Sequence, residues 1–124
     1  MNKIILLLIT LLLINTVSGA FLIDVTLLNQ DPDPVDAGDI VELRFKVENT
    51  GEFTRDEVKL EIIPEAPFSL YSGEPIKNLG VLRGDQKGRD AVIADFKLKV
   101  DPEAADGDHE IKVKVHSGAT SWIY

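Results

Sequence analysis

Carboxylates gather in two short segments of this chain and carry its strongest chemical signal. The first segment contributes four aspartates, Asp31, Asp33, Asp36 and Asp39. The second contributes four more acids, Asp101, Glu103, Asp106 and Asp108. Clustered carboxylate oxygens are ligands that Ca²⁺ prefers, so both segments are candidate calcium sites. Their spacing does not match the Asp-x-Asp-x-Asp-Gly loop. Acids beside Pro32 and Pro34 are equally the ordinary content of turns, which is the interpretation we favour.

No other combination of residues predicts a catalytic or cofactor site. The chain has no cysteine, which excludes thiolate metal sites and cysteine nucleophiles. Its two histidines, His109 and His116, fall at the start and the end of one predicted strand, too far apart to share a metal ion. The serines lack the context of a nucleophile elbow. We therefore expect no catalytic residue and no cofactor, with calcium as the one weak candidate.

The charge balance is acidic, with 13 Lys and Arg against 21 Asp and Glu and a net charge of −8. Binding to a phosphate backbone requires clustered cations, so this balance argues against a nucleic-acid partner. It argues equally against binding to anionic membrane surfaces. The partners that remain to be considered are proteins and carbohydrates.

The N-terminus has the order of a secretory signal peptide. Lys3 precedes an apolar run from Ile4 to Ile14, and the small residues at 18–20 form a cleavage site. A membrane-spanning helix needs roughly 20 apolar residues, and this run is about half as long. We therefore expect cleavage after Ala20 and no membrane span in the mature chain. Residues 1–20 are the predicted signal peptide, and residues 21–124 are one secreted or cell-surface domain.

Alternation of apolar and polar residues with a period of two dominates the rest of the chain. Val41, Leu43, Phe45 and Val47 alternate with charged residues, as in a strand with one buried face. Such segments, separated by turns, predict seven strands at about 21–28, 40–48, 57–63, 67–71, 76–82, 91–100 and 109–115, with a final stub at 120–124. The pattern predicts an all-β, seven-stranded antiparallel β-sandwich. Its core is expected to hold Phe45, Val47, Leu60, Ile62, Phe96, Leu98, Ile111 and Val113.

Two further groups of residues have both a structural and a binding interpretation. The cations of the outer faces could form basic stripes, but cross-strand pairing with nearby acids is the interpretation we favour. They are Arg44, Lys46, Lys97, Lys99, Lys112 and Lys114, with Glu42, Glu48, Glu61 and Asp95 as partners. The aromatic residues that could contact sugar are Phe68, Tyr71, Trp122 and Tyr124. For Phe68 and Trp122 a place in the core is favoured.

Three motifs resemble those of extracellular Ig-like modules. They are Val-Asp-Ala-Gly-Asp at 35–39 with its Asn-Thr-Gly corner at 49–51, Leu-Gly-Val-Leu-Arg-Gly-Asp at 79–85, and the segment 101–111. They look like the motifs of CARDB and S-layer-associated modules on archaeal and bacterial surfaces, and they are similar to those of modules appended to secreted glycosidases. The resemblance implies an Ig-like, fibronectin type III-like sandwich whose two acidic loops lie at the same end. It implies a role in display, spacing or adhesion and carries over no catalytic residue.

The segment from Thr120 to Tyr124 is where such modules continue into a full last strand. Either the sequence is a fragment of a longer protein, or the last strand is truncated and its apolar edge can accept another strand. We expect a non-catalytic secreted or cell-surface module with a structural or adhesive role, whose partners are other surface proteins or neighbouring domains of the same polypeptide. One alternative is a carbohydrate-binding or accessory module of a secreted glycoside hydrolase. The other is a filament subunit that exchanges Phe21–Leu28 as a donor strand.

Overall fold

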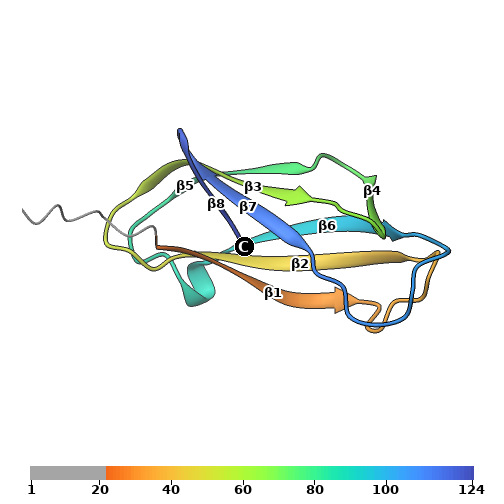
Figure 1. Ribbon diagram of the computed structural model, residues 1–124. Coiled ribbons are helices and arrows are strands. Elements are labelled where there is room, and N and C mark those ends of the chain that lie inside the picture. Colours follow the sequence, from red (N-terminus) through yellow and green to blue (C-terminus); the bar gives the residue numbers. More distant parts are fainter. Residues whose placement is uncertain (1–21) are drawn as a thin grey trace, which may run out of the picture.

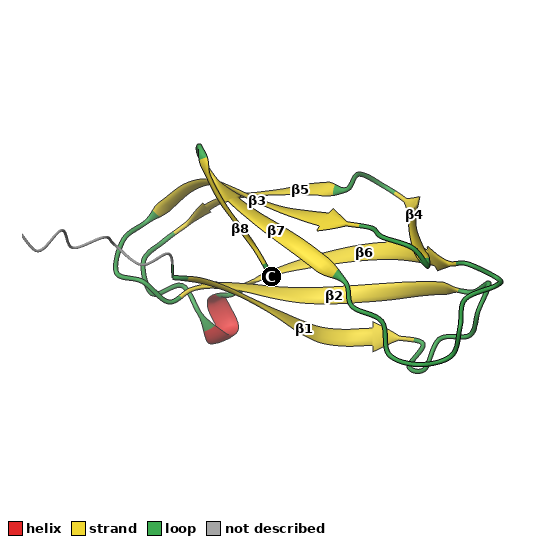
Figure 2. Ribbon diagram, in the orientation of Figure 1, coloured by secondary structure: helices red, strands yellow, loops and turns green. Residues whose placement is uncertain are grey.

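The computed structural model describes residues 22–124, and the predicted signal peptide lies outside them. The described residues form eight strands and one short 3-10 turn. These elements are β1 (Ile23–Asp31), β2 (Ile40–Asn49), β3 (Arg55–Ile63), β4 (Phe68–Ser72), β5 (Ile76–Leu82), η1 (Gly88–Asp90), β6 (Val92–Val100), β7 (Lys112–Ser117) and β8 (Thr120–Ile123). One sheet has the order β1-β2-β6-β4 and the other β5-β3-β7-β8, and all pairs are antiparallel. The two sheets lie face to face (Figure 1, Figure 2), so the predicted all-β sandwich is confirmed.

The seven predicted strands correspond to β1 to β7 within a few residues at each end, and the predicted stub at 120–124 is the eighth strand. The end of β1 and the start of β7 differ from the predicted bounds, and both differences change the extent of the adjoining loops. β1 continues to Asp31, because a bulge between Leu27 and Asn29 resets its pairing with β2. β7 begins only at Lys112, so the prediction that His109 starts this strand is wrong, and His109 lies in the loop before it.

The core lies between the two sheets and consists of the inward-facing residues of their strands. Seven of the eight predicted core residues are buried, and Ile111 is half-buried at the end of the sandwich. Phe45 and Phe96 meet edge to face, with ring centroids 6.0 Å apart and planes at 70°. This geometry is favourable for aromatic pairs, and it fixes the packing of β2 against β6 in a chain that has no disulfide.

The C-terminal hairpin closes one side of the sandwich. β8 pairs with β7 from Thr120 opposite Ser117 to Ile123 opposite Lys114. The backbone of Tyr124 then exchanges two hydrogen bonds with that of Val113. The Tyr124 hydroxyl donates to the carbonyl of Ile23 in the other sheet, and burial raises the pKa of this phenol. The hairpin therefore ties the edge of one sheet to the edge of the other.

Among residues 22–124, no helix has both the length and the apolar character needed to cross a membrane.

Candidate functional site

The two acidic segments lie together at one end of the sandwich (Figure 1), as the resemblance implied. They form the β1–β2 loop and the β6–β7 loop. The backbone N–H of Gly38 donates to the carbonyl of Val100 at 3.1 Å, and the N–H of Val100 donates to the carbonyl of Asp39 at 2.9 Å. Gly38 has a positive φ of 87°, which glycine adopts freely, and it packs beside Pro102. These contacts hold the two loops side by side.

A cavity of about 590 Å³ opens between these loops. Its floor is apolar and consists of residues at the end of the core, Val41, Leu43, Phe68, Val100 and Ile111. Its rim is acidic and includes Asp33, Asp36, Asp106 and Asp108. Four of the eight acids named as calcium candidates therefore line one cavity, whereas Asp31, Asp39, Asp101 and Glu103 do not line it.

His109 forms part of the wall of the cavity. Its ring meets the Phe68 ring edge to face, with centroids 6.0 Å apart and planes at 87°. Its Nε2 lies 2.9 Å from the carbonyl oxygen of Ala105, four residues earlier in the same loop. His109 therefore braces the β6–β7 loop against the start of β4.

The net charge of the described residues resides at this end. Residues 31–39 and 101–111 contain nine Asp and Glu and no Lys or Arg. Elsewhere in residues 22–124, twelve Lys and Arg balance twelve Asp and Glu. The faces and the opposite end are therefore neutral in sum, and we call the two loops with their cavity the acidic end. Low-dielectric walls beside such a charge strengthen its attraction for cations.

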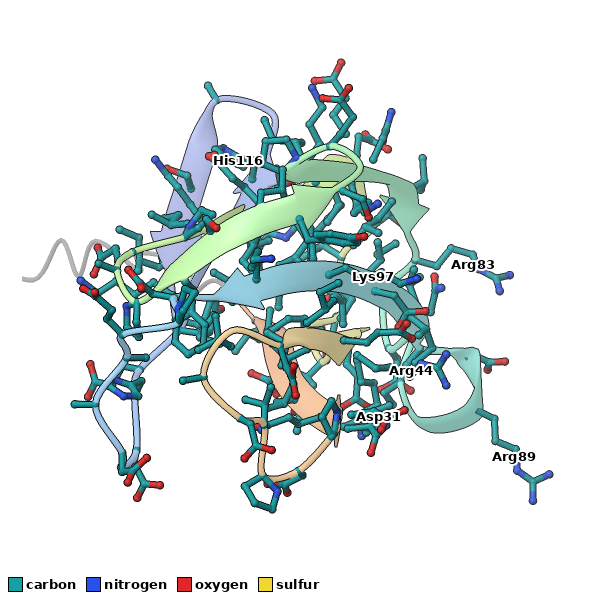
Figure 3. The ribbon with its side chains drawn as sticks, turned by 90° about the vertical axis from the view of Figure 1, so that its right-hand side faces the viewer. Asp31, Arg44, Arg83, Arg89, Lys97 and His116 are labelled. Atoms are coloured by element: carbon teal, nitrogen blue, oxygen red, sulfur yellow. The ribbon has the colours of Figure 1, made fainter. Side chains whose placement is uncertain are left out.

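The carboxylates of the acidic end are not arranged as metal ligands. In the part of the chain that the structure describes, no group of three or more His, Asp or Glu side chains is placed to hold a metal ion. The Asp101 carboxylate instead accepts a hydrogen bond from the backbone N–H of Glu103 at 2.9 Å, as in a turn. Asp31, at the end of β1 (Figure 3), lies opposite Glu42 in the sheet. Asp101 therefore serves as a turn residue, Asp31 lies in a strand, and Asp33, Asp36, Asp106 and Asp108 line the cavity.

The outer face of the first sheet shows the cross-strand charge pairs that the sequence predicts. Arg44 of β2 pairs with Asp95 of β6 at 2.9 Å, and this bond raises the pKa of the Arg44 guanidinium. Lys97 of β6 lies 3.9 Å from Glu42 of β2, on the same face as Arg44 (Figure 3). This prediction is confirmed for both pairs. Because they are exposed, they contribute solubility rather than stability.

Glu48, at the end of β2, is held by two groups. The backbone N–H of Gly88 in η1 donates to its carboxylate at 2.8 Å, and the Lys46 ammonium lies 3.3 Å away. The bond from Gly88 is the main reason that the pKa of Glu48 is lowered. Glu48 thus anchors the β5–β6 connection to the first sheet.

The aromatic residues do not gather into one platform. Phe68 packs against the core, as predicted, and Trp122 on β8 is half-buried and lies opposite the buried Val115 of β7. Tyr71 is 52% exposed on β4, which is the edge strand farthest from β1. Tyr124 contacts β1 through its hydroxyl. The exposed rings of Tyr71 and Tyr124 therefore lie at opposite edges of the sandwich, and the exposed Phe53 ring lies in the β2–β3 turn.

A buried asparagine, which sequence reasoning placed only in a turn, organises the opposite end. Asn49 is 1% exposed, and its Nδ2 donates to the carbonyls of Phe53, Leu82 and Arg83 at 2.8, 3.2 and 3.0 Å. Its Oδ1 accepts from the backbone N–H of Gly51 at 3.1 Å. One side chain thus joins the β2–β3 turn to the β5–β6 connection. The signal was present in the sequence, because Asn49 continues the inward-facing series of β2 and is polar at a core position.

The comparisons with known proteins extend over most of the chain. The chain matches no protein-family model. The uncharacterized protein MJ1561 of Methanocaldococcus jannaschii is 35% identical over 117 residues, which cover 92% of this chain and 20% of that protein. The uncharacterized protein MJ1506 of the same organism is 31% identical over 118 residues, which cover 93% of this chain and 26% of that protein. The chain therefore spans about a fifth to a quarter of the length of these relatives.

Proposed function

We propose that this chain is a non-catalytic, Ig-like module with a fibronectin type III-like strand plan, of the CARDB or S-layer-associated kind, which serves as a spacer or structural component of a secreted or cell-surface protein. The observation that carries the proposal is the share of each protein that the sequence matches cover. Nearly the whole chain is similar to a short part of two much longer proteins. A segment that recurs in this way behaves as a module beside other segments.

The architecture supports a mechanical role. The sandwich is longer along its strands than across them (Figure 1), and its core is closed by packing between the sheets. The hydrogen bonds of Asn49 fix the loops at one end, and those between Gly38 and Val100 join the loops at the other. A unit whose two ends are braced in this way keeps its shape under load.

The surface location rests on the N-terminal sequence. Lys3, the apolar run to Ile14 and the small residues at 18–20 have the order of an export signal. The absence of cysteine in the whole sequence fits a domain whose stability does not depend on the redox state of its compartment.

The decisive experiment expresses the full chain with a C-terminal tag in an archaeal host and determines its N-terminus and its cellular fraction. We expect a mature protein that begins at Phe21 and that external protease removes from intact cells. The matched control, Leu7→Asp with Leu8→Asp, interrupts the apolar run and should leave unprocessed protein inside the cell. Wild-type protein that is unprocessed and protected from external protease would refute the proposed location.

A further inference from the structure

We propose that the cavity at the acidic end is a docking site for an extended basic segment of a partner polypeptide, in which one apolar side chain is flanked by Lys or Arg. The apolar side chain would enter the cavity, and the flanking cations would lie on the rim. This inference does not depend on where in the cell the protein acts.

The floor of the cavity favours an apolar anchor. Phe68, Val35 and Ile111 are half-buried there rather than buried, so they keep apolar surface in contact with water. Covering such surface is favourable by about 25 cal/mol per Å². The volume of about 590 Å³ lies within the range of roughly 300–1,000 Å³ that is usual for ligand pockets. One large side chain would therefore fit with room for its backbone.

The rim determines the charge of the partner. Among the described residues, no Lys or Arg lines the cavity, whereas four aspartates do. The two loops concentrate nine acids, so the like charges repel one another in the free protein. A cationic partner would relieve this repulsion, and an anionic partner would increase it. Charge complementarity thus selects a basic occupant.

An extended polypeptide satisfies both requirements better than a compact cation does. In an extended chain, side chains two residues apart point to the same side, so cations two positions before and after an apolar residue can face the rim while that residue enters the cavity. The longer relatives contain this module beside other segments of their chains, so polypeptide neighbours accompany it there. The occupant we infer is therefore such a segment, rather than a free polyamine or a second acidic copy of this chain.

The test titrates the protein produced from the full chain into a fluorescent peptide, Lys-Ser-Lys-Ser-Phe-Ser-Lys-Ser-Lys, in which every Lys lies on the same side of the extended chain as Phe, and follows anisotropy. Two control peptides replace Phe by Ser, or every Lys by Glu. We expect the Phe peptide to bind about fivefold more tightly than the Ser peptide, and the Glu peptide not to bind. Raising the salt from about 50 mM to about 500 mM should weaken binding severalfold, because the rim charges become screened.

Matched variants locate the binding. Asp36→Asn with Asp106→Asn should weaken binding of the Phe peptide about tenfold. Glu52→Gln with Asp90→Asn makes the same change of charge at the opposite end and should weaken it less than twofold. Ala104→Leu fills the cavity and should reduce the affinity for the Phe peptide to that for the Ser peptide. If Ala104→Leu lowers the melting temperature, the binding site is located instead by an NMR titration of the wild-type protein, in which the methyl resonances are followed as the Phe peptide is added.

Several outcomes would overturn the proposal. Equal weakening by the two charge variants would indicate diffuse attraction, and equal affinity for the Phe and Ser peptides would exclude the apolar anchor. Spermine that displaces the Phe peptide at equal concentration would assign the site to a small polyamine. Concentration-dependent self-association abolished by Ala104→Leu would assign the cavity to a second copy. In the resonance measurement, peptide-induced shifts at Val35 and Ile111 support the proposal, and shifts confined to other methyl groups contradict it.

Discussion

Replacement of Asn49 by alanine tests whether a single buried side chain holds one end of the sandwich. In the native structure this side chain makes hydrogen bonds with three carbonyls and one backbone N–H, which belong to two separate loops. Alanine removes all of them and leaves a small void beside the end of β2. The β2–β3 turn and the β5–β6 connection would then lose the hydrogen bonds through which the Asn49 side chain joins them.

The expected loss follows from the geometry. A typical intramolecular hydrogen bond contributes about 1 kcal/mol net, and a buried group left without a partner costs ~1–3 kcal/mol. The bonds of Asn49 differ in burial, since those to Phe53 and Arg83 are part-buried and those to Leu82 and Gly51 are buried. Water can reach the part-buried groups after substitution, so we expect a total loss of about 3–4 kcal/mol. In a domain of this size that lowers the melting temperature by roughly 12–25 °C.

The assay is thermal and urea unfolding, followed by circular dichroism and by the fluorescence of Trp122, the one tryptophan in the chain. The matched control is Asn78→Ala, because the exposed Asn78 side chain bonds only to the N–H of Gly80. Asn49→Asp keeps the acceptor for Gly51 but turns a carboxylate toward three carbonyls, so it should destabilise more than alanine does at neutral pH. If Asn49→Ala and Asn78→Ala unfold within a few degrees of each other, the role assigned to Asn49 is refuted.

The remaining predictions concern other parts of the fold. Gly84→Ala should destabilise by more than ~3 kcal/mol, because its Cβ would lie 2.1 Å from the carbonyl oxygen of Glu52. A Cβ added at Gly107 would meet no atom within 4 Å, so Gly107→Ala should lower the free energy of unfolding by only about 1 kcal/mol, because of the positive φ. Equal urea midpoints for Gly84→Ala and Gly107→Ala would contradict this reasoning. Phe96→Ala should cost ~3–5 kcal/mol, and a melting temperature lowered by only a few degrees would place Phe96 outside the core. The lowered pKa of Glu48 means that its contribution to stability is present above the ordinary glutamate value of 4.5 and is lost as the pH falls through its value in the folded protein. The difference in urea midpoint between wild type and Glu48→Gln should therefore shrink between about pH 7 and about pH 3, and a constant difference would contradict the assignment.

The strands could be predicted because the core faces of β2, β3 and β6 keep strict alternation. The end of β1 could not be predicted in this way. The bulge at Leu27 to Asn29 shifts the register, after which Gln30 pairs with Leu43. A period of two counted from Ile23 fails at that point, so the alternation ends although the strand continues to Asp31. An extra residue in a strand is a local departure that alternation alone conceals.

Part of the candidate site could likewise be predicted from the sequence, and part could not. The acids of its rim are visible in the sequence as two clusters. The floor is not visible, because it forms only when Phe68 at the start of β4 and Ile111 before β7 meet at the end of the core. His109 was expected in a strand, and its contact with Phe68 depends on a loop conformation that alternation does not encode. Tertiary packing, rather than local pattern, creates the cavity.

The two ends of the sandwich differ in how closely their loops pack. This difference bears on where we propose that a partner binds. At the end that contains Asn49, the backbone of Gly84 approaches Glu52 so closely that no side chain fits, and shared hydrogen bonds fix the loops. At the acidic end, Gly107 lies in open space, and the side chains of residues 22–124 leave the cavity unfilled. The Asn49 end is close-packed, although the Phe53 ring in its β2–β3 turn is 74% exposed. The open, charged end offers partly exposed apolar surface inside a cavity, which is why we propose docking at the acidic loops rather than at the Asn49 corner.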